Sequence, residues 1–423
     1  MSRLAIRLLC ALWITLSIAK TPAAAVELTI SCGALGVELS LCTDAVQHWE
    51  KKTGNKVTII TTPNSSTDRL ALYLQMLASR TSQIDVLQID VVWAGILAAH
   101  LADLGPYMGD KTASHFPALI ENNTIEGRLV AMPWWADVGL LYYRADLLER
   151  FGSKPPDTWQ QMADIAERIQ TAERAAGNDR IWGFVFQGKA YEGLTCNALE
   201  WIDAYRGGTV VDTNGNITVQ NPRAIEALML AGSWVGKISP KGVLNYDEEA
   251  ARGVFQTGNA VFMRNWPYAW SLAQRDDSPV RAKIGVMPLP RGGPDGKTPG
   301  VLGGWHLAVS RYSRAPEAAA DLVAFLTSRE QQKRRAISAS YNPTIPELYD
   351  DPDILAANPF FADLLAPLRN ATARPSRIAG PHYNRLSNDI FRAVHDILGG
   401  APATERTAQL SDDLDRLKYR ANW

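Results

Sequence analysis

The sequence contains few cysteines and histidines and almost no net charge. Its four cysteines form no Cys-x-x-Cys pair and its six histidines are scattered, so we expect neither a metal nor a cofactor. The formal net charge is -1 at pH 7, far from the basic composition of proteins that bind nucleic acid or anionic lipid. Neither of these partners is therefore expected.

Long hydrophobic runs are also missing, except near the N-terminus. The apolar stretch Leu8–Ala19 is about a dozen residues long, which is too short to span a bilayer. Two arginines precede it, and Ala23-Ala24-Ala25 follows it as a small-residue cleavage site. This order predicts a signal peptide over residues 1–25, cleaved after Ala25, and export to the periplasm. An uncleaved membrane anchor is the alternative, and the mass of the exported protein distinguishes the two.

Cleavage would leave three cysteines, which are Cys32, Cys42 and Cys196. Because the number is odd, at least one thiol is unpaired or pairs with another chain. A bond between Cys32 and Cys42 would close a short loop and is compatible with an oxidising compartment. The sequence does not decide whether that bond forms.

Tryptophan is the residue in excess. The chain has 13 Trp, whereas an average usage of about 1% would give about four. Hydrophobic residues make up 46% and charged residues 21% of the 423 positions, which is typical of a globular chain too long for one core. We therefore expect two or three domains and a site that is aromatic rather than ionic.

From residue 26 onward, short apolar strands alternate with amphipathic helices. Strands are predicted over Leu28–Ser31, Lys56–Thr61 and Asp85–Asp90, and a helix follows each of them. A β-α-β-α-β order is typical of a parallel sheet whose faces are covered by helices. Ligands are then expected at the loops that follow the strands.

The rest of the chain also mixes helices and strands and suggests a second lobe. Thr158-Trp-Gln-Gln161 predicts a helix start, and Asn214-Gly215 predicts a hairpin turn. Three further segments are interpreted as crossings between two lobes, namely Val138–Tyr143, Ile284–Pro288 and Tyr341–Pro346. The lobes would thus be joined by strands rather than by a flexible linker.

The segment Pro133–Arg150 combines two adjacent indoles, one carboxylate and an apolar run. Because strand side chains alternate between faces, Trp135 and Asp137 share a face and Trp134 does not. Flat aromatic surfaces beside a hydrogen-bond acceptor suit the C–H faces and hydroxyls of a sugar. The alternative is an ordinary core strand in which both indoles fill space.

Other strand ends carry residues of the same kinds. Each also has a structural interpretation, such as an acid in a first helical turn, a helix cap or a β-bulge. The functional interpretation gathers carboxylates, arginine and rings from distant parts of the chain into one cleft between lobes. The candidates are Glu38, Ser66, Thr67, Arg69, Asp90, Trp266, Tyr268, Gly303, Gly304 and Trp305.

Several motifs make the chain resemble a known family. They are Val57-Thr-Ile, Ile84–Trp93, Ala131–Arg144, Pro156-Asp-Thr-Trp159, Gly258–Met263 and Gly303-Gly-Trp305, with the more discriminating Cys32–Leu39 and Thr62–Leu70. The chain resembles the extracellular solute-binding proteins of family 1, the maltose-binding-protein-like receptors of ABC sugar importers. It is most similar to the trehalose/maltose-binding group, over essentially the whole mature chain.

The resemblance implies an α/β, two-lobed periplasmic binding protein fold of type II. Each lobe would be a β-sheet flanked by helices, and three crossings would join the lobes. The lobes would comprise residues 26–136 with 290–340, and residues 137–289 with 341–423. A monomer would bind an α-linked disaccharide between them, trehalose first and maltose or sucrose next, and deliver it to permease subunits in the inner membrane.

The resemblance also implies a role for each candidate residue. Acids would accept hydrogen bonds from sugar hydroxyls, arginine and hydroxyl side chains would donate them, and rings would cover apolar faces. The acceptors would be Glu38, Asp90 and Asp137, the donors Arg69 with Ser66 or Thr67, the rings Trp135, Trp266, Tyr268 and Trp305, and the backbone donors Gly303 and Gly304. Arg374 would add a contact from the second lobe, with Tyr383 a weaker candidate.

Two other functions fit parts of the pattern. A secreted glycosidase would use two of Glu38, Asp90 and Asp137 as acid and base, with their carboxyl groups about 5 to 10 Å apart. A ferric-ion receptor would use Tyr142 and Tyr143, but adjacent strand residues point to opposite faces and cannot both ligate one ion. We expect the transport receptor, and release of free glucose would indicate the enzyme instead.

Overall fold

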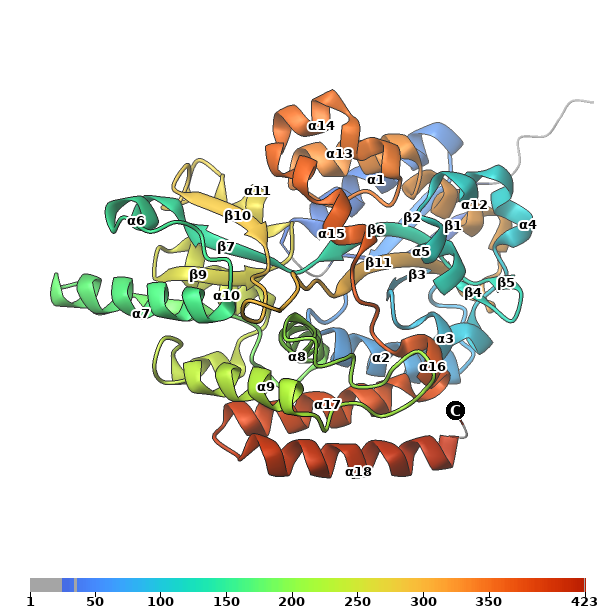
Figure 1. Cartoon of the computed structure of the whole chain (residues 1–423). Helices are drawn as coiled ribbons and strands as arrows, with labels where there is room; N and C mark the ends of the chain where they lie inside the picture. Colours follow the sequence, from blue (N-terminus) through green and yellow to red (C-terminus); the bar gives the residue numbers. More distant parts are fainter. Residues whose placement is uncertain (1–24, 34–35, 422) are drawn as a thin grey trace, which may run out of the picture.

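The computed structural model describes residues 25–33, 36–421 and 423. The predicted signal peptide, apart from Ala25, lies outside these residues. Two large sheets dominate the described chain, one of five strands and one of four (Figure 1). We call the five-stranded sheet with its helices the first lobe and the four-stranded sheet with its helices the second lobe. In the described part, no helix is both long and apolar enough to cross a membrane.

The first lobe is built on the strand order β2-β1-β3-β11-β6. Its strands are β1 (Glu27–Ser31), β2 (Lys56–Ile60), β3 (Val86–Asp90), β6 (Met132–Val138) and β11 (Leu302–Val309). The first three pair in parallel, whereas β11 runs antiparallel to both β3 and β6. The parallel β-α-β-α-β unit predicted for the N-terminal part is thereby confirmed.

The first helices begin and end where the sequence indicates. Helix α1 (Glu38–Thr53) ends at Gly54, whose φ of 78° favours glycine. Helix α2 (Ser66–Ala78) is capped by the side chain of Ser65, which accepts from the amide of Asp68 at 3.3 Å. The other elements of this lobe are α3 (Ala94–Leu97), η1 (Ala98–His100), α4 (Gly105–Met108), η2 (Gly109–Ser114), α5 (Pro117–Asn122), β4 (Thr124–Ile125), β5 (Arg128–Leu129), α12 (Pro316–Leu326) and α13 (Arg329–Ala339).

The second lobe is built on the strand order β10-β7-β9-β8. Its elements are β7 (Leu140–Arg144), α6 (Ala145–Arg150), α7 (Trp159–Ala175), β8 (Trp182–Val185), α8 (Glu192–Ala204), α9 (Pro222–Trp234), η3 (Lys241–Asn245), α10 (Glu248–Gln256), β9 (Ala260–Asn265), α11 (Ala269–Ala273), β10 (Ile284–Pro288), α16 (Ser376–Ala379), η6 (Gly380–His382), α17 (Tyr383–Leu398) and α18 (Ala403–Ala421). Helices α17 and α18 lie against α8 and α9 along one edge of the molecule (Figure 1).

Two sequence motifs in the second lobe, a helix cap and an Asn-Gly turn, can be compared with the structure. The side chain of Thr158 caps α7 and accepts from the amide of Gln161 at 3.2 Å. The hairpin predicted about Asn214-Gly215 is a turn closed by a single antiparallel bridge between Val211 and Ile217. A turn signal therefore marks the reversal of the chain without ensuring two regular strands.

Much of the excess tryptophan lies in the core of the second lobe. Trp159, Trp201 and Trp234 are buried and pack with Phe184 and Phe186. The ring centres of Trp201 and Trp234 are 5.6 Å apart. The abundance of tryptophan therefore indicates an aromatic core here and does not by itself locate a site.

Within the residues that the structure describes, three segments carry the chain between the lobes. Gly139 joins β6 to β7, so the predicted crossing at Val138–Tyr143 is a single residue between strands of different sheets. A Cβ atom on Gly139 would lie 2.0 Å from Oε1 of Glu200, so only glycine fits at this passage. The second passage, residues 289–301, comes after β10 rather than within it.

We propose that the third passage lies later in the chain than Tyr341–Pro346. The helices that follow Tyr341–Pro346 pack on one another and on β6, and the amide of Ala136 donates to the carbonyl of Asn342 at 3.1 Å. These helices are η4 (Pro346–Asp350), α14 (Pro352–Ala357), η5 (Pro359–Asp363) and α15 (Leu365–Arg369). The chain reaches the second lobe through residues 370–375. We therefore propose that residues 341–369 belong to the first lobe.

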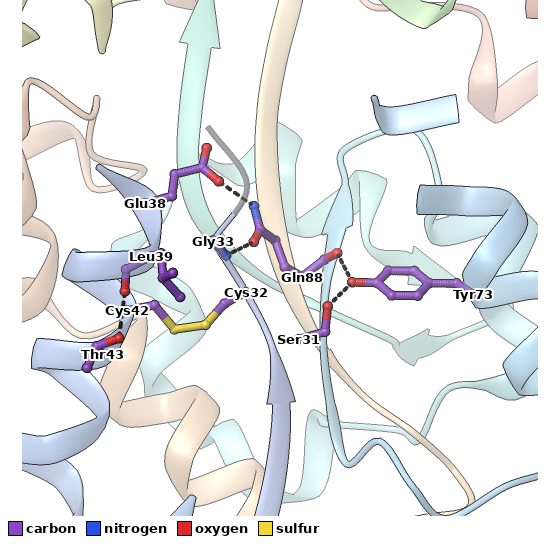
Figure 2. Close-up of a disulfide and its surroundings, with 9 residues drawn as sticks. All are labelled: Ser31, Cys32, Gly33, Glu38, Leu39, Cys42, Thr43, Tyr73 and Gln88. Atoms are coloured by element: carbon purple, nitrogen blue, oxygen red, sulfur yellow. Dashed lines mark hydrogen bonds between the residues drawn. A yellow bond between two sulfur atoms is a disulfide. The ribbon is translucent and has the colours of Figure 1, made fainter. Parts of the chain in front are cut away.

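A disulfide joins Cys32, directly after β1, to Cys42 in α1 (Figure 2). It fixes the end of a central strand to the helix that follows it. Cys196 in α8 is buried and free. The pairing that the sequence left open is thereby decided.

Candidate functional site

A cavity lies between the two lobes, and residues from both lobes line it. The first lobe contributes the ends of β1, β2 and β3 with the adjoining β6 and β11, and the second lobe contributes the starts of α8 and α10 and the segment after β9. The lining residues are Glu38, Asn64, Ser66, Asp90, Trp135, Asp137, Tyr191, Glu192, Gly193, Cys196, Glu248, Trp266, Tyr268, Gly303, Gly304, Trp305, Tyr341 and Arg374. Every predicted binding residue lines the cavity except Thr67, Arg69 and the weaker candidate Tyr383.

Strand β6 places one indole in the cavity and the other behind it. Trp135 and Asp137 line the cavity, whereas Trp134, one residue out of phase, does not. Trp135 is paired with Trp305 of β11, and Trp305 is paired with Asp90 of β3. Neighbouring strands therefore bring side chains from three distant parts of the sequence to one place.

Gly303 and Gly304 allow β11 to approach its neighbours closely. A Cβ atom on Gly303 would lie 3.1 Å from Cζ3 of Trp266, and one on Gly304 would lie 2.4 Å from the carbonyl oxygen of Trp135. Gly304 also has φ 122°, which L side chains rarely adopt. The register of β11 against β6 shifts directly after Trp305, so a close approach and a β-bulge occur together.

Asp137 is a buried carboxyl group whose proton affinity is raised. It is 7% exposed and accepts a hydrogen bond from Nε1 of Trp135 at 3.0 Å. Burial, and then the negative charge of Glu38, raise the pKa of Asp137 from 3.8 to about 7. The bond from Trp135 and the charges of Arg264 and Arg335 oppose this shift. Near neutral pH this carboxyl can therefore donate as well as accept a hydrogen bond.

Glu38 begins α1 and is in contact with Gln88 of β3. Nε2 of Gln88 donates to Oε2 of Glu38 at 3.4 Å, and Oε1 of Gln88 accepts from the amide of Gly33 at 3.0 Å (Figure 2). The Cys32–Cys42 disulfide lies beside this contact and fixes the start of α1. Glu38 is thus both a first-turn acid and a residue of the cavity wall.

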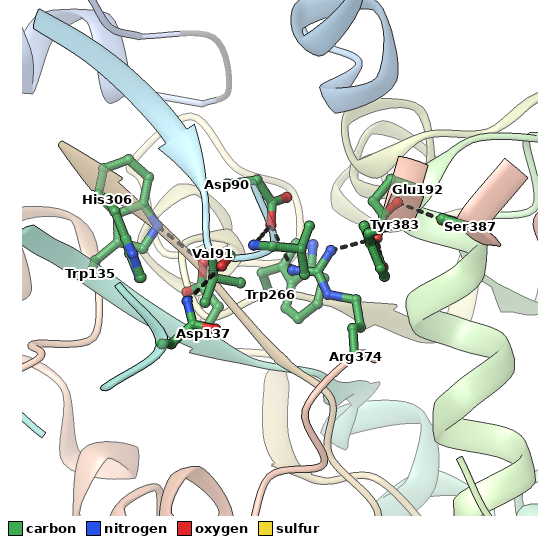
Figure 3. Close-up of polar contacts among 12 residues, drawn as sticks. Asp90, Val91, Trp135, Asp137, Glu192, Trp266, His306, Arg374, Tyr383 and Ser387 are labelled. Carbon is green, nitrogen blue, oxygen red and sulfur yellow. Dashed lines mark hydrogen bonds and ion pairs between the residues drawn. The ribbon is translucent and has the colours of Figure 1, made fainter. Parts of the chain in front are cut away.

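Arg374 joins the two lobes at the cavity (Figure 3). Its Nη2 donates to Oδ1 of Asp90 in the first lobe and its Nη1 to Oε1 of Glu192 in the second, each at 2.7 Å. The hydroxyls of Tyr383 and Ser387 also donate to Glu192, at 2.5 and 2.6 Å. The Arg374 side chain is 2% exposed, so both ion pairs are shielded from solvent. Tyr383 therefore supports Glu192 from behind the cavity wall.

Glu248, the first residue of α10, fixes two rings of the second lobe. Its Oε1 accepts from Nε1 of Trp266 at 3.3 Å, and its Oε2 accepts from the hydroxyl of Tyr191 at 2.6 Å. Burial raises the pKa of Glu248, although both hydrogen bonds oppose the shift. The neighbouring Glu249 accepts from the hydroxyl of Tyr268 at 2.7 Å. Two adjacent acids therefore hold three of the rings that line the cavity.

Sequence reasoning missed part of the cavity wall. Glu192 and Glu248 each stand in the first turn of a helix, as Glu38 does. The argument applied to Glu38 would have selected both if it had been extended to the second lobe. The other missed lining residues, for which the sequence offers no comparable signal, are Asn64, Tyr191, Gly193, Cys196 and Tyr341.

Thr67 and Arg69 lie behind the cavity. The hydroxyl of Thr67 accepts from the amide of Glu192 at 3.2 Å, a contact between the lobes. Nε and Nη2 of the buried Arg69 donate to the carbonyl of Pro63 at 3.2 and 3.1 Å. The Arg69 guanidinium lies 4.3 Å from the ring centre of Trp305. Neither side chain lines the cavity, so their role as donors to a ligand stays a prediction.

The adjacent tyrosines of β7 do not converge on a shared site. Tyr142 is fully buried, and its hydroxyl donates to the main-chain oxygen of Trp266 at 2.9 Å. Neither Tyr142 nor Tyr143 lines the cavity. Among the described residues, no group of three or more His, Cys, Asp or Glu side chains is placed to hold a metal ion. The arrangement gives no support to a ferric-ion receptor.

The chain matches the model of a known protein family. That family is described as bacterial extracellular solute-binding protein, and its model matches residues 40–333. The chain belongs to this family. The resemblance inferred from the sequence motifs is therefore confirmed. Because the family consists of binding proteins, this solute-binding protein is not an enzyme.

Two proteins are similar to this solute-binding protein over nearly its whole length. A probable ABC transporter-binding protein of Deinococcus radiodurans is 48% identical over 405 residues, which cover 95% of this chain and 96% of that protein. The structure of maltose-bound T. maritima MalE3 has a TM-score of 0.88 and 39% identity, over 93% of this chain and 100% of that one.

A third similar structure supports the fold alone. It is a solute-binding protein of Agrobacterium vitis with bound D-mannitol, with a TM-score of 0.81 and 23% identity over 94% of this chain and 99% of that one. Together with MalE3, it agrees with the two-lobed, type II architecture of the described chain.

Proposed function

We propose that this solute-binding protein captures an α-linked disaccharide between its lobes and delivers it to the permease of an ABC importer. Trehalose is the first candidate ligand, and maltose or sucrose comes next. The observation that carries the proposal is the make-up of the cavity wall, where rings, carboxylates and glycine backbone from both lobes come together. The 39% identity to maltose-bound MalE3 over 93% of the chain supports a disaccharide.

The pairing of rings with acids favours a sugar over an apolar ligand. Trp135 is hydrogen-bonded to Asp137 and Trp266 to Glu248, so each indole has a carboxylate at its edge. A pyranose ring has apolar C–H faces and hydroxyls around its rim, and it can use both kinds of contact at once. Two such ring–acid pairs, one from each lobe, are suited to two linked rings.

Contacts from both lobes support delivery by closure. A ligand that touches both lobes binds the closed state more tightly than the open state and so shifts the population toward closure. The permease subunits would then recognise the closed arrangement of the two lobes. We propose that the protein acts as a monomer, without cofactor, in the periplasm.

Fluorescence titration with a panel of sugars tests the ligand. We expect a saturable change in intrinsic tryptophan fluorescence with trehalose, maltose or sucrose and little change with cellobiose or glucose. Because no chemical step is involved, the bound disaccharide should be recovered intact after hours. Absence of any saturable change with the three α-linked sugars would contradict the proposal, and release of free glucose would favour the glycosidase.

Intact mass of the exported protein tests the proposed location. We expect the mature chain to begin at Val26 because of the small-residue site before it. A mass that retains residues 1–25 in the exported fraction would contradict cleavage.

A further inference from the structure

Each of the three indoles in the cavity wall is covered by an arginine that does not line the cavity. Trp305 is covered by Arg69 at 4.3 Å between guanidinium carbon and ring centre, and Trp266 by Arg264 at 3.7 Å. Trp135 is covered by Arg335 at 4.9 Å. The three arginines come from α2, β9 and α13, and each of them is buried. The same arrangement therefore occurs independently at three places.

The guanidinium groups of Arg69 and Arg264 are held by hydrogen bonds and an ion pair with residues that do not line the cavity. Arg69 donates twice to the carbonyl of Pro63, and Arg264 forms a buried ion pair with Glu200. The Nη1 of Arg264 also donates to Oε1 of Gln187 at 3.1 Å. These bonds fix the plane and the height of each guanidinium relative to the ring that it covers.

Arg335 contacts two neighbouring indoles whose ring centres are 4.6 Å apart. Its guanidinium carbon lies 4.4 Å from the ring centre of Trp134 and 4.9 Å from that of Trp135. Its Nη2 donates to the carbonyl oxygen of Trp134. The indole that does not line the cavity thus helps to fix the one that does.

A guanidinium stacked on one face of an indole restricts that ring. The attraction between the cation and the ring is strongest when the two are parallel and in contact, so tilting or flipping the ring loses it. A ring that is already immobile loses little entropy when a ligand settles on its other face. An arginine behind the ring can therefore strengthen binding without touching the ligand.

We propose that Arg69, Arg264 and Arg335 are positioning residues for the ligand, and that each fixes one indole of the cavity wall by stacking on the face turned away from the cavity. The inference rests on the proposed function for the identity of the ligand, but the fixing of the rings is a property of the ligand-free protein. Arg69 offers the cleanest test because it donates to a main-chain carbonyl. Removing Arg264 would leave Glu200 buried without its partner.

Ring mobility in the ligand-free protein is the first test. In protein labelled with 5-fluorotryptophan, the 19F signal of Trp305 is identified by its loss in Trp305→Phe. Arg69→Met keeps an unbranched side chain but removes the guanidinium. We expect the Trp305 signal to broaden or split in Arg69→Met, because the ring then adopts more than one orientation. A Trp305 line as narrow as that of the wild type would overturn the proposal for this ring.

Arg174 provides a matched control. Its Nε and Nη2 donate to the carbonyl of Ile181 at 3.1 and 2.9 Å, and it lies 4.3 Å from the ring centre of Trp182. This geometry repeats that of Arg69, but Trp182 does not line the cavity. Arg174→Met should therefore alter the 19F signal of Trp182 and leave the dissociation constant for sugar within about twofold of the wild type.

A double-mutant cycle on sugar affinity is the second test. Calorimetric titration with maltose and trehalose is carried out on wild type, Arg69→Met, Trp305→Leu and the double variant. Arg69→Met should raise the dissociation constant about 5- to 30-fold when Trp305 is present. In the Trp305→Leu background, Arg69→Met should raise the dissociation constant less than about twofold, because Arg69 acts through that ring. Equal factors in both backgrounds would indicate a general effect on the fold and would overturn the proposal.

A second double-mutant cycle uses Arg335→Met and Trp135→Leu. If Arg69→Met does not fold, this cycle tests whether an arginine affects sugar affinity through the indole that it covers. If none of trehalose, maltose and sucrose binds the wild-type protein, the proposed function fails. The 19F measurement still decides whether the arginines hold the rings.

Discussion

The carboxyl groups of the cavity wall differ in their partners, and this gives them different roles. Asp90 and Glu192 are bound to Arg374, so they are occupied with joining the lobes. Glu248 orients two rings through its hydrogen bonds. Asp137 instead accepts from Trp135 and lies in the field of a second acid. It is therefore the acid that we expect to respond most to a bound hydroxyl.

Asp137→Ala is expected to weaken binding of the preferred disaccharide by about 1 to 3 kcal/mol, because it removes a buried partner of a sugar hydroxyl. The protein should remain folded, and calorimetric titration measures the loss. Asp110→Ala, an exposed acid of η2, is the control and should leave binding unchanged. Wild-type affinity in Asp137→Ala would place this carboxyl outside the binding site.

The pKa of Asp137 also makes a prediction about stability. Because its pKa is raised from 3.8 to about 7 on folding, the folded state favours the protonated form. The stabilisation is complete below the unfolded pKa and is lost as pH rises through the folded pKa. Relative to Asp137→Asn, the free energy of unfolding of the wild type should thus fall by about 2 to 4 kcal/mol between about pH 4 and pH 7. Urea unfolding of the ligand-free proteins measures this, and parallel pH curves would contradict it.

Strand alternation predicted which indole of the pair Trp134–Trp135 lines the cavity, because it depends only on neighbours in the chain. The arginines behind the rings were beyond sequence reasoning, since stacking joins residues from unrelated elements. Arg69 illustrates the limit. Its position beside Ser66 and Thr67 suggested a ligand donor, whereas its Nε and Nη2 donate to the carbonyl of Pro63 and its guanidinium lies over the ring of Trp305.

At the level of elements, helix starts and stops could be predicted more reliably than the path between lobes. Ser65, Thr158 and Gly54 act through bonds or dihedral angles within a few residues, so their sequence context decides the outcome. The segment Tyr341–Pro346 could either return to the first lobe or cross to the second. The packing of α15 on β6 favours a return to the first lobe. No feature of the local sequence predicts that contact.

Gly139→Ala is expected to destabilise the protein by about 2 to 4 kcal/mol, because the added methyl group would displace the buried Glu200 and its partner Arg264. Urea unfolding at neutral pH measures the change. Gly253→Ala in α10 is a suitable comparison, since a Cβ there meets no atom within 4 Å, and it should be neutral or slightly stabilising. Equal stability of the two variants would show that the passage from β6 to β7 at Gly139 tolerates a side chain.

At the level of the whole molecule, three covalent passages connect the two lobes in the described part of the chain, and the buried cation of Arg374 lies between them. Arg374 comes from the third passage and reaches an acid in each lobe. If it is removed, Asp90 and Glu192 face each other without a positive charge between them. The relative position of the lobes therefore depends on this buried side chain as well as on the backbone.

Arg374→Met is expected to increase the radius of gyration of the ligand-free protein and to weaken sugar binding, because repulsion between the two uncompensated acids favours separation of the lobes. Small-angle X-ray scattering measures the first effect and calorimetry the second. Arg416→Met is the control, since Arg416 pairs with Asp413 at an exposed position within α18. If Arg374→Met changes neither the radius of gyration nor the affinity for sugar, Arg374 has no role in closure.

The position of the free thiol has a consequence for the biogenesis of the protein. Cys32 and Cys42 are separated by 10 residues near the start of the chain, whereas Cys196 comes much later. A polypeptide that is translocated N-terminus first would present the early pair to oxidising enzymes before Cys196 emerges. Once α8 is packed, burial raises the pKa of Cys196 and suppresses the thiolate that would attack the bond. Order of emergence and subsequent burial therefore both protect the correct pairing from rearrangement.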